Sequence, residues 1–210
     1  GRVGTYLAEI SPRHTLVRRG EVIPNNTGPI VVCTRNDDLN TVLKATPEFR
    51  QGDLIFVQNG MLISWFKDHG LSSVTQALLY FAISAKGDAP VDGGGTIVTG
   101  PKADLFVEYL GKGGIRATAV GALEYQQGMA EKYLWNCIFG LLSQAKESTV
   151  GEVVSNHYSD YELLCNELGA LTERGLGISL KPGWIERLAT YSNTISDYRG
   201  AVKEWPWRNG

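Results

Sequence analysis

The segment from Tyr125 to Lys146 carries the two residues whose types and spacing best suit catalysis. Its apolar residues recur every three and four positions, which predicts a helix. Lys132 and Asn136 are four residues apart and therefore share one face of that helix. A lysine facing a dry cleft has a lowered pKa and can transfer protons near neutrality, while an amide one turn away can hydrogen-bond a carbonyl or carboxylate. The alternative is a surface lysine beside an asparagine at the edge of the core.

A second candidate site opens the sequence as Gly1-Arg2-Val3-Gly4. These residues match the last four positions of G-x-G-x-x-G, whose glycines let the backbone approach a pyrophosphate at a helix N-terminus. The first glycine and the strand before it are missing from the chain. A strand predicted at His14 to Arg18 follows at the distance that a βαβ unit requires, so we interpret the glycine pair as a dinucleotide-binding turn. An upstream apolar strand ending in Gly-x-Gly would strengthen this interpretation.

Arg18 and Arg19 follow that predicted strand and bear on the choice of cofactor. An acidic residue at this place binds the ribose 2′-hydroxyl of NAD, whereas arginine accommodates the 2′-phosphate of NADP. The two arginines favour NADP, and Glu21 keeps NAD open. A solvated basic turn is the other interpretation.

Polar residues also follow two predicted buried strands. Thr34 ends the strand predicted over Pro29 to Thr34 and Arg35 follows it, while Asn59 comes after the strand predicted over Asp53 to Gln58. Ligands of an open parallel sheet bind beyond the carboxyl ends of its strands, so these residues are candidates for the cofactor site. Each alone is also compatible with an ordinary turn.

The C-terminal residues place an acidic side chain, Glu204, among aromatic ones. This segment fits either a pocket lining or a surface tail. The three cysteines and three histidines are scattered, so the sequence predicts no metal site and no disulfide framework.

The first half of the chain alternates short apolar strands with helical stretches, which predicts a parallel α/β sheet. Besides the segments above, we expect helices and strands over the following ranges: helices 3–10, 39–45 and 103–110, and strands 75–84, 95–98 and 115–120.

The second half is predicted to be helical over 125–146, 159–174 and 184–203. The change of period between residues 121 and 126 marks the expected domain boundary.

The net charge of −2, with no run of basic residues, argues against binding to nucleic acid or anionic membranes. The apolar runs are too short to cross a bilayer. Unpaired cysteines predict a reducing, cytoplasmic environment.

Several of these positions, taken in order, resemble the motifs of the ketopantoate reductases. They are Arg35, Gln58-Asn59-Gly60-Met61, Lys132-x-x-x-Asn136-Cys137, Gly151-Glu152 and Glu204-x-x-x-x-Asn209-Gly210. The resemblance runs over nearly the whole chain. It implies a Rossmann-type domain over 1–123 that lacks its first strand, and a small all-helical domain over 124–210 for substrate binding and dimerisation. It also implies NADPH-dependent reduction of 2-dehydropantoate to pantoate in a cleft between them.

The resemblance further implies roles for individual residues. Lys132 would be the general acid, Asn136 and Asn59 would hold substrate and cofactor, and Glu204 would lie near both. Ser196 would match a substrate-binding serine, with Ser192 as its rival.

Arg35 stands where the family usually has lysine near the cofactor. Gly140 stands where a second asparagine is common, and the chain is shorter than the family's.

Two other functions fit the same features. One is a β-hydroxyacid or opine-type dehydrogenase, which shares the domain plan and a helical lysine. The other is a non-catalytic nucleotide-binding protein. A helical second domain is compatible with a homodimer, and Trp184, Trp205 and Trp207 fit either a core or an interface.

Overall fold

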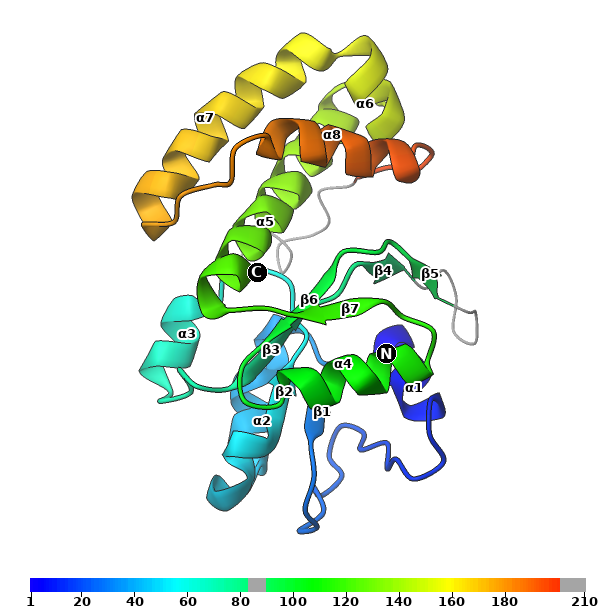
Figure 1. The fold of residues 1–210 in the computed structure, drawn as a ribbon, viewed down its shortest axis with the longest axis vertical. Helices are drawn as coiled ribbons and strands as arrows, with labels where there is room; N and C mark the ends of the chain where they lie inside the picture. Colours follow the sequence, from blue (N-terminus) through cyan, green and yellow to red (C-terminus); the bar gives the residue numbers. More distant parts are fainter. Residues whose placement is uncertain (83–89, 201–210) are drawn as a thin grey trace. The chain divides into compact units, whose positions relative to one another are not determined.

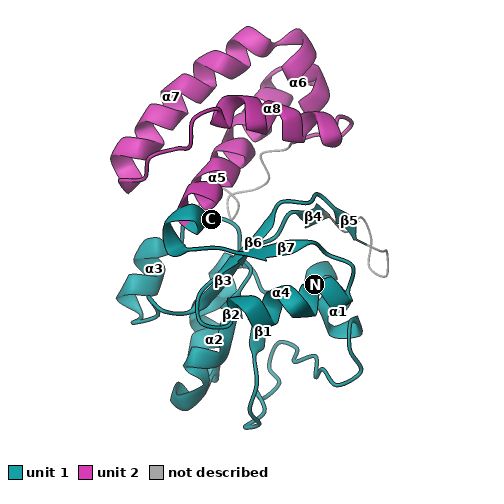
Figure 2. Ribbon diagram, in the orientation of Figure 1, with its two compact units in different colours: residues 1–125 teal, residues 126–210 magenta. Residues whose placement is uncertain are grey.

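The computed structural model describes residues 1–82 and 90–200. The chain divides into two compact units, Gly1–Tyr125 and Gln126–Gly210, coloured separately in Figure 2. The first unit combines strands and helices, and the described part of the second is helical (Figure 1). The predicted fold class, a Rossmann-type α/β unit followed by an all-helical unit, is confirmed.

Unit 1 is built on a five-stranded sheet with the order β1-β2-β3-β6-β7. Its strands are β1 (Ile30–Val32), β2 (Leu54–Phe56), β3 (Thr75–Leu78), β6 (Thr96–Thr99) and β7 (Ala117–Ala119). Strands β1, β2 and β3 run parallel, with Ile30 opposite Leu54 and Ile55 opposite Thr75. Their carboxyl ends therefore meet at one edge of the sheet.

The predicted parallel sheet is found for β1, β2 and β3, but the prediction is wrong at β6, which runs antiparallel to β3 with Ala77 opposite Val98. The predicted strand over 75–84 is also interrupted after Leu78. The chain there enters a separate two-stranded sheet of β4 (Phe81–Ala82) and β5 (Val91–Asp92). A parallel neighbour needs a crossover of a dozen or more residues, usually a helix, whereas this sheet returns the chain beside β3 in the opposite direction.

Helices cover both faces of the main sheet. Helices α1 (Arg2–Glu9) and α4 (Ala103–Lys112) pack on one face, in a core that includes Leu7, Ile55 and Phe106. Helices α2 (Leu39–Ala45) and α3 (Ile63–Asp68) pack on the other, around Leu54 and Phe56. Two 3-10 helices, Asn36–Asp38 and Glu48–Asp53, precede α2 and β2. Burial on both faces explains why β2 is uniformly apolar.

The strand predicted at His14 to Arg18 is not formed, and residues 12–20 are exposed. A strand needs a neighbour to accept its backbone hydrogen bonds. Among the described residues, no strand pairs with this segment. The loop is instead anchored near its end by the buried Arg50, which donates to the carbonyl oxygens of Pro24 (2.6 Å) and Gly28 (2.5 Å).

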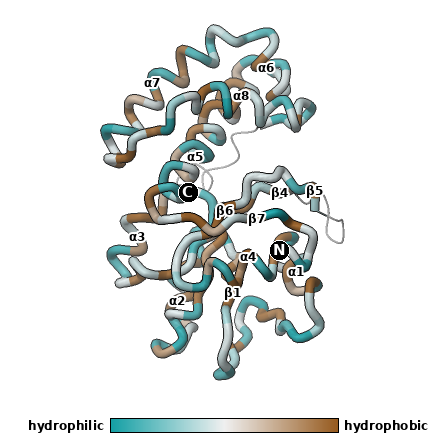
Figure 3. Tube along the Cα trace, in the orientation of Figure 1, coloured by the Kyte–Doolittle hydropathy of each residue, from teal (hydrophilic) through white to brown (hydrophobic). Residues whose placement is uncertain are grey.

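The described part of unit 2 contains four helices around one apolar core. They are α5 (Ala122–Ala145), which begins in the last residues of unit 1, α6 (Val150–Asn156), α7 (Tyr158–Leu176) and α8 (Trp184–Thr194). The core is centred on Phe139 and Tyr161, and Trp184 packs against it. The trace of α7 alternates between apolar and polar residues in Figure 3, as expected for a helix with one face on a core.

Helix α8 ends at Thr194, earlier than the predicted end at Lys203, which lies outside the described residues. Among the described helices, none has the length and apolar character needed to cross a membrane. The same residues hold no cluster of His, Cys, Asp or Glu that could bind a metal ion.

Candidate functional site

Helix α1 starts at the glycine pair and packs closely on β1. A Cβ atom on Gly4 would lie 3.0 Å from the Cβ of Cys33, so a side chain there would push the helix away from the strand. Gly1 supplies no side-chain cap, and the first N–H groups of a helix lack intrahelical acceptors. The end of α1 formed by Gly1, Arg2, Val3 and Gly4 therefore has the donors and dipole that favour an anion.

The carboxyl ends of β1 and β2 are tied together by amide side chains. Asn36 Nδ2 donates to the carbonyl oxygen of Asn59 at 3.0 Å. Gln58 Nε2 donates to the carbonyl oxygens of Val32 (2.8 Å) and Thr34 (3.2 Å). The exposed side chains of Thr34, Arg35 and Asn59 thus come together at the edge where the sequence places the cofactor site.

Gln58 is 6% exposed, and its Oε1 has no hydrogen-bond partner among the described residues. The two carbonyl acceptors fix the amide orientation, because a flipped amide would set oxygen against oxygen. An acceptor buried in this way requires a donor from water or from a ligand. Because this oxygen is closed to bulk solvent, an enclosed water is the donor that suits it.

Arg18 and Arg19 lie on an exposed loop of the same unit. Arg19 Nη2 is 2.9 Å from both carboxylate oxygens of Asp38, just before α2. Glu21 Oε2 accepts from the backbone N–H of Arg18 at 2.6 Å. The predicted 2′-phosphate ligands therefore stand beside two carboxylates.

Two of these groups have chemistry that a dinucleotide requires. The α1 N-terminus offers donors for a pyrophosphate. The 18–21 loop carries arginines, which suit a ribose phosphate, and a carboxylate, which suits a ribose hydroxyl.

In unit 2, Lys132 and Asn136 lie on α5 and are both partly buried. Burial lowers the pKa of Lys132 from 10.5 to about 8, because removal from water disfavours the ammonium form. The lysine is therefore largely protonated at pH 7 but releases its proton far more readily than an exposed one. This is the property required of a general acid near neutrality.

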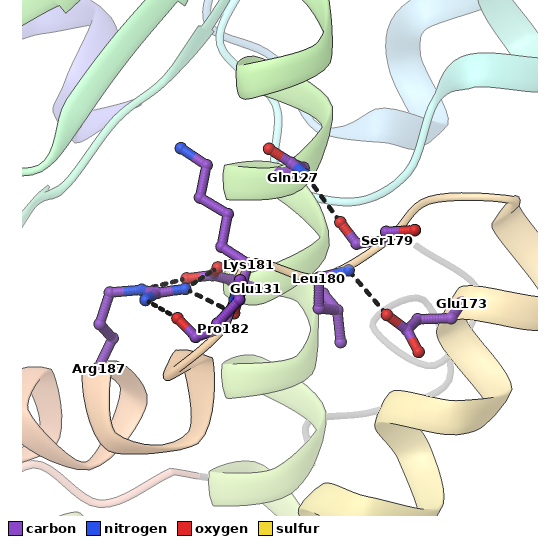
Figure 4. A network of polar contacts seen from close by, with 8 residues as sticks. All are labelled: Gln127, Glu131, Glu173, Ser179, Leu180, Lys181, Pro182 and Arg187. Carbon is purple, nitrogen blue, oxygen red and sulfur yellow. Dashed lines mark hydrogen bonds and ion pairs between the residues drawn. The ribbon is translucent and has the colours of Figure 1, made fainter.

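A polar network fixes α5 against the connector between α7 and α8 (Figure 4). Glu131, the neighbour of Lys132, pairs with Arg187 through contacts of 2.5 and 3.1 Å. Arg187 also donates to the carbonyl oxygen of Pro182 at 2.8 Å, and Gln127 donates to that of Ser179 at 2.8 Å. Gln127 and Glu131 are one turn apart, so they anchor the same stretch of helix that carries Lys132.

The two serines that competed for the substrate-binding role differ in accessibility. Ser192 is fully buried and occupied, because it accepts from Trp135 Nε1 (2.8 Å) and donates to the carbonyl oxygen of Leu188 (2.9 Å). Ser196 is exposed. Of the two, only Ser196 presents a hydroxyl to solvent, and its role remains a prediction.

Gly151 and Glu152, two motif residues, have structural roles. The backbone N–H of Gly151 donates to the carbonyl oxygen of Ser196 at 3.0 Å, and a Cβ on Gly151 would lie 2.8 Å from the Cβ of Ser196. Glu152 forms a capping box with Thr149 at the start of α6. Gly151 therefore attaches the segment after α8 to α6, and Glu152 stabilises the start of α6.

The segment after α8 crosses α5 at two glycines, Gly200 and Gly140, which have no side chains. A Cβ on Gly200 would lie 2.6 Å from the carbonyl oxygen of Phe139 and 3.1 Å from the Cα of Gly140. This crossing lies one turn beyond Asn136. Glu204, four residues further along the sequence, lies outside the described residues.

Sequence reasoning missed Asp38 as the partner of Arg19, and it named Gln58 in a motif without foreseeing the bridge that its amide makes to the end of β1. An acidic residue at the start of a helix normally indicates capping, so nothing in the pattern linked Asp38 to Arg19. Gln58 carried a signal that was not used: a polar residue at the end of a buried strand needs a partner.

No protein-family model matches the sequence, and no curated protein is significantly similar to it. Solved structures do match. The 2-dehydropantoate 2-reductase of Geobacter metallireducens GS-15 has a TM-score of 0.63 and 15% identity, over 98% of this chain and 81% of that one. The probable 2-dehydropantoate 2-reductase of Bacillus subtilis has a TM-score of 0.64 and 15% identity, over 85% of this chain and 64% of that one.

A D-mandelate dehydrogenase, solved with NADH and anilino(oxo)acetate, has a TM-score of 0.57 and 11% identity, over 89% of this chain and 64% of that one. The chain spans 59% to 64% of four of the matched structures. It therefore has the fold of the ketopantoate reductases, and the resemblance seen in its motifs is confirmed at the level of the fold.

Proposed function

We propose that this chain is a nicotinamide-dependent reductase of a small 2-keto acid, 2-dehydropantoate or a relative, with Lys132 as its general acid. The observation that carries the proposal is the partly buried Lys132, whose pKa is lowered to about 8, with Asn136 one turn away on α5. The fold shared with 2-dehydropantoate 2-reductases and a D-mandelate dehydrogenase supports the class of substrate.

In this reaction the protein has to position the substrate and place a positive charge beside its carbonyl oxygen. A bound nicotinamide supplies hydride to the carbonyl carbon. Negative charge then develops on the carbonyl oxygen, where the Lys132 ammonium stabilises it and donates the proton. General acid catalysis of this kind contributes about 10²–10⁴-fold. The Asn136 amide donates to the substrate carbonyl or carboxylate. Asn59 and Ser196 are the other residues assigned to substrate binding.

The cofactor is assigned to unit 1. Gly1, Arg2, Val3 and Gly4 would hold the pyrophosphate at the start of α1, while Thr34, Arg35 and Asn59 would line the strand ends. Arg18 and Arg19 would take the 2′-phosphate of NADP. Glu204 keeps the role that the family resemblance gives it, near substrate and cofactor.

The test is turnover of NADPH and NADH with a panel of 2-keto acids that includes ketopantoate. We expect oxidation with at least one member and a loss of about 10²–10⁴-fold in kcat for Lys132→Ala. Lys181→Ala, which removes a lysine of the α7–α8 connector, is the matched control. Binding of a dinucleotide without turnover on any keto acid would instead indicate a non-catalytic nucleotide-binding protein.

The same panel separates the neighbouring dehydrogenases. Activity on β-hydroxyacids, or on a keto acid only in the presence of an amine, would replace the 2-keto-acid assignment.

A further inference from the structure

Residues 18–21 form a tight turn. The backbone N–H of Glu21 donates to the carbonyl oxygen of Arg18 at 3.0 Å, and Gly20, at the third position, has a φ of 84°. Only glycine adopts such an angle readily, as a type II turn requires. Glu21 Oε2 accepts from the Arg18 N–H at 2.6 Å, so its carboxylate is engaged by the turn that carries it.

Arg19 makes a different contact. Its Nη2 reaches both oxygens of Asp38 at 2.9 Å, nineteen residues away in sequence. The Arg19 side chain is 84% exposed and that of Asp38 is 29% exposed. The ion pair thus lies at the surface, where water and competing ions can reach it, and it joins the turn to the residue before α2.

We infer that Asp38 sets the preference between the two nicotinamide dinucleotides, which rests on the proposed binding of a dinucleotide by unit 1. A 2′-phosphate that approaches Arg19 must displace the Asp38 carboxylate and then meets its negative charge. The ribose 2′-hydroxyl of NAD, in contrast, is a donor and finds in Asp38 an acceptor. Asp38 therefore weakens binding of the phosphorylated cofactor and supports the other.

Asp38 has this role rather than its acidic neighbours because of where their carboxylates lie. Glu21 has one carboxylate oxygen on the turn amide, so it is less available to a ribose. Asp37 is exposed and adjacent in sequence, which makes it a matched control of the same charge.

The experiment measures dissociation constants of NADPH and NADH, and of adenosine 2′,5′-bisphosphate and 5′-AMP as probes of the adenosine end, for the wild type and for Asp38→Asn. We expect the variant to bind NADPH and the bisphosphate about five- to thirtyfold more tightly, because removing a carboxylate removes a repulsion equivalent to about fivefold for each phosphate charge at contact distance in water. NADH binding should stay equal or weaken. Asp37→Asn should change the NADPH to NADH ratio by less than twofold.

A second pair of variants tests whether the effect of Asp38 depends on Arg19. In an Arg19→Ala background, Asp38→Asn should change NADPH affinity by a smaller factor than it does alone, since the competition for Arg19 is gone. An unchanged cofactor ratio in Asp38→Asn, in a protein that binds both dinucleotides, overturns the inference and leaves the proposed function intact. A wild type that binds neither dinucleotide overturns both.

Discussion

The strand ends of unit 1 and the Lys132 face of unit 2 use polar groups in opposite ways. On the loop next to the strand ends, the Arg19 side chain is 84% exposed and pairs with Asp38. On α5 a lysine is partly buried and its pKa falls to about 8. Exposed pairs contribute little to stability and can exchange partners, which suits binding. A desolvated group is costly to keep charged, which suits proton transfer.

The largest expected effect tests the role of Lys132 in proton transfer. Since Lys132 must be protonated to act as an acid, kcat for reduction should be constant below pH 8 and fall about tenfold per pH unit above it. Lys132→Met should be slower by about 10²–10⁴-fold and lose this dependence. The measurement is the pH profile of both proteins at saturating substrate, and a wild-type midpoint near 10.5 would contradict it.

The same lysine predicts a stability signature that does not depend on turnover. Its pKa is lower in the folded than in the unfolded chain, so between about pH 8 and 10.5 the unfolded state binds more protons. The free energy of unfolding should therefore gain a positive slope with pH in this window, and that contribution should vanish in Lys132→Met. Equal slopes in urea unfolding of the two proteins would contradict the lowered pKa.

Substitutions of Gln58 test whether the stability of the strand ends depends on this one buried side chain. Gln58→Glu places a carboxylate oxygen where Nε2 now donates to two carbonyl oxygens, and should destabilise the protein by about 2–4 kcal/mol. Gln58→Met removes the donor and the unpaired acceptor together and should cost about 1 kcal/mol. If urea unfolding shows equal losses, the fixed amide orientation is wrong.

Sequence reasoning succeeded where one local pattern determines the outcome. Continuous apolar runs predicted β1 and β2, and apolar residues recurring every three and four positions predicted α5 and α7. It failed where the outcome depends on residues far apart. His14 to Arg18 has strand character but lacks a neighbouring strand, and the direction of β6 is set by the β4–β5 sheet.

The candidate site divides in the same way. Lys132 and Asn136 were found because helical spacing places them together. The Asp38–Arg19 and Gln58–Val32 contacts join residues 19 and 26 positions apart, and no periodicity reports them.

Gly151 provides a packing test in unit 2. Gly151→Ala should destabilise the protein by about 1–3 kcal/mol, because the new Cβ would lie 2.8 Å from the Cβ of Ser196 and 3.0 Å from its backbone. Gly175→Ala in α7 meets nothing within 4 Å and should stabilise by about 0.5–1 kcal/mol, as alanine favours a helix. Thermal unfolding of both variants checks this, and a neutral Gly151→Ala would mean that the segment after α8 is not held there.

The smallest effects compare two ion pairs that differ in exposure. Glu131 is 11% exposed where it meets Arg187, whereas Lys112 and Glu108 on α4 are 64% and 72% exposed. Arg187→Gln leaves a largely buried carboxylate with a weaker partner and should cost about 1–2 kcal/mol. Glu108→Gln should change the free energy of unfolding by less than about 0.5 kcal/mol. Urea unfolding of both variants is the measurement. Equal effects of the two substitutions on the free energy of unfolding would mean that α5 is held by its apolar core alone, and that exposure does not separate the charged groups of the two units.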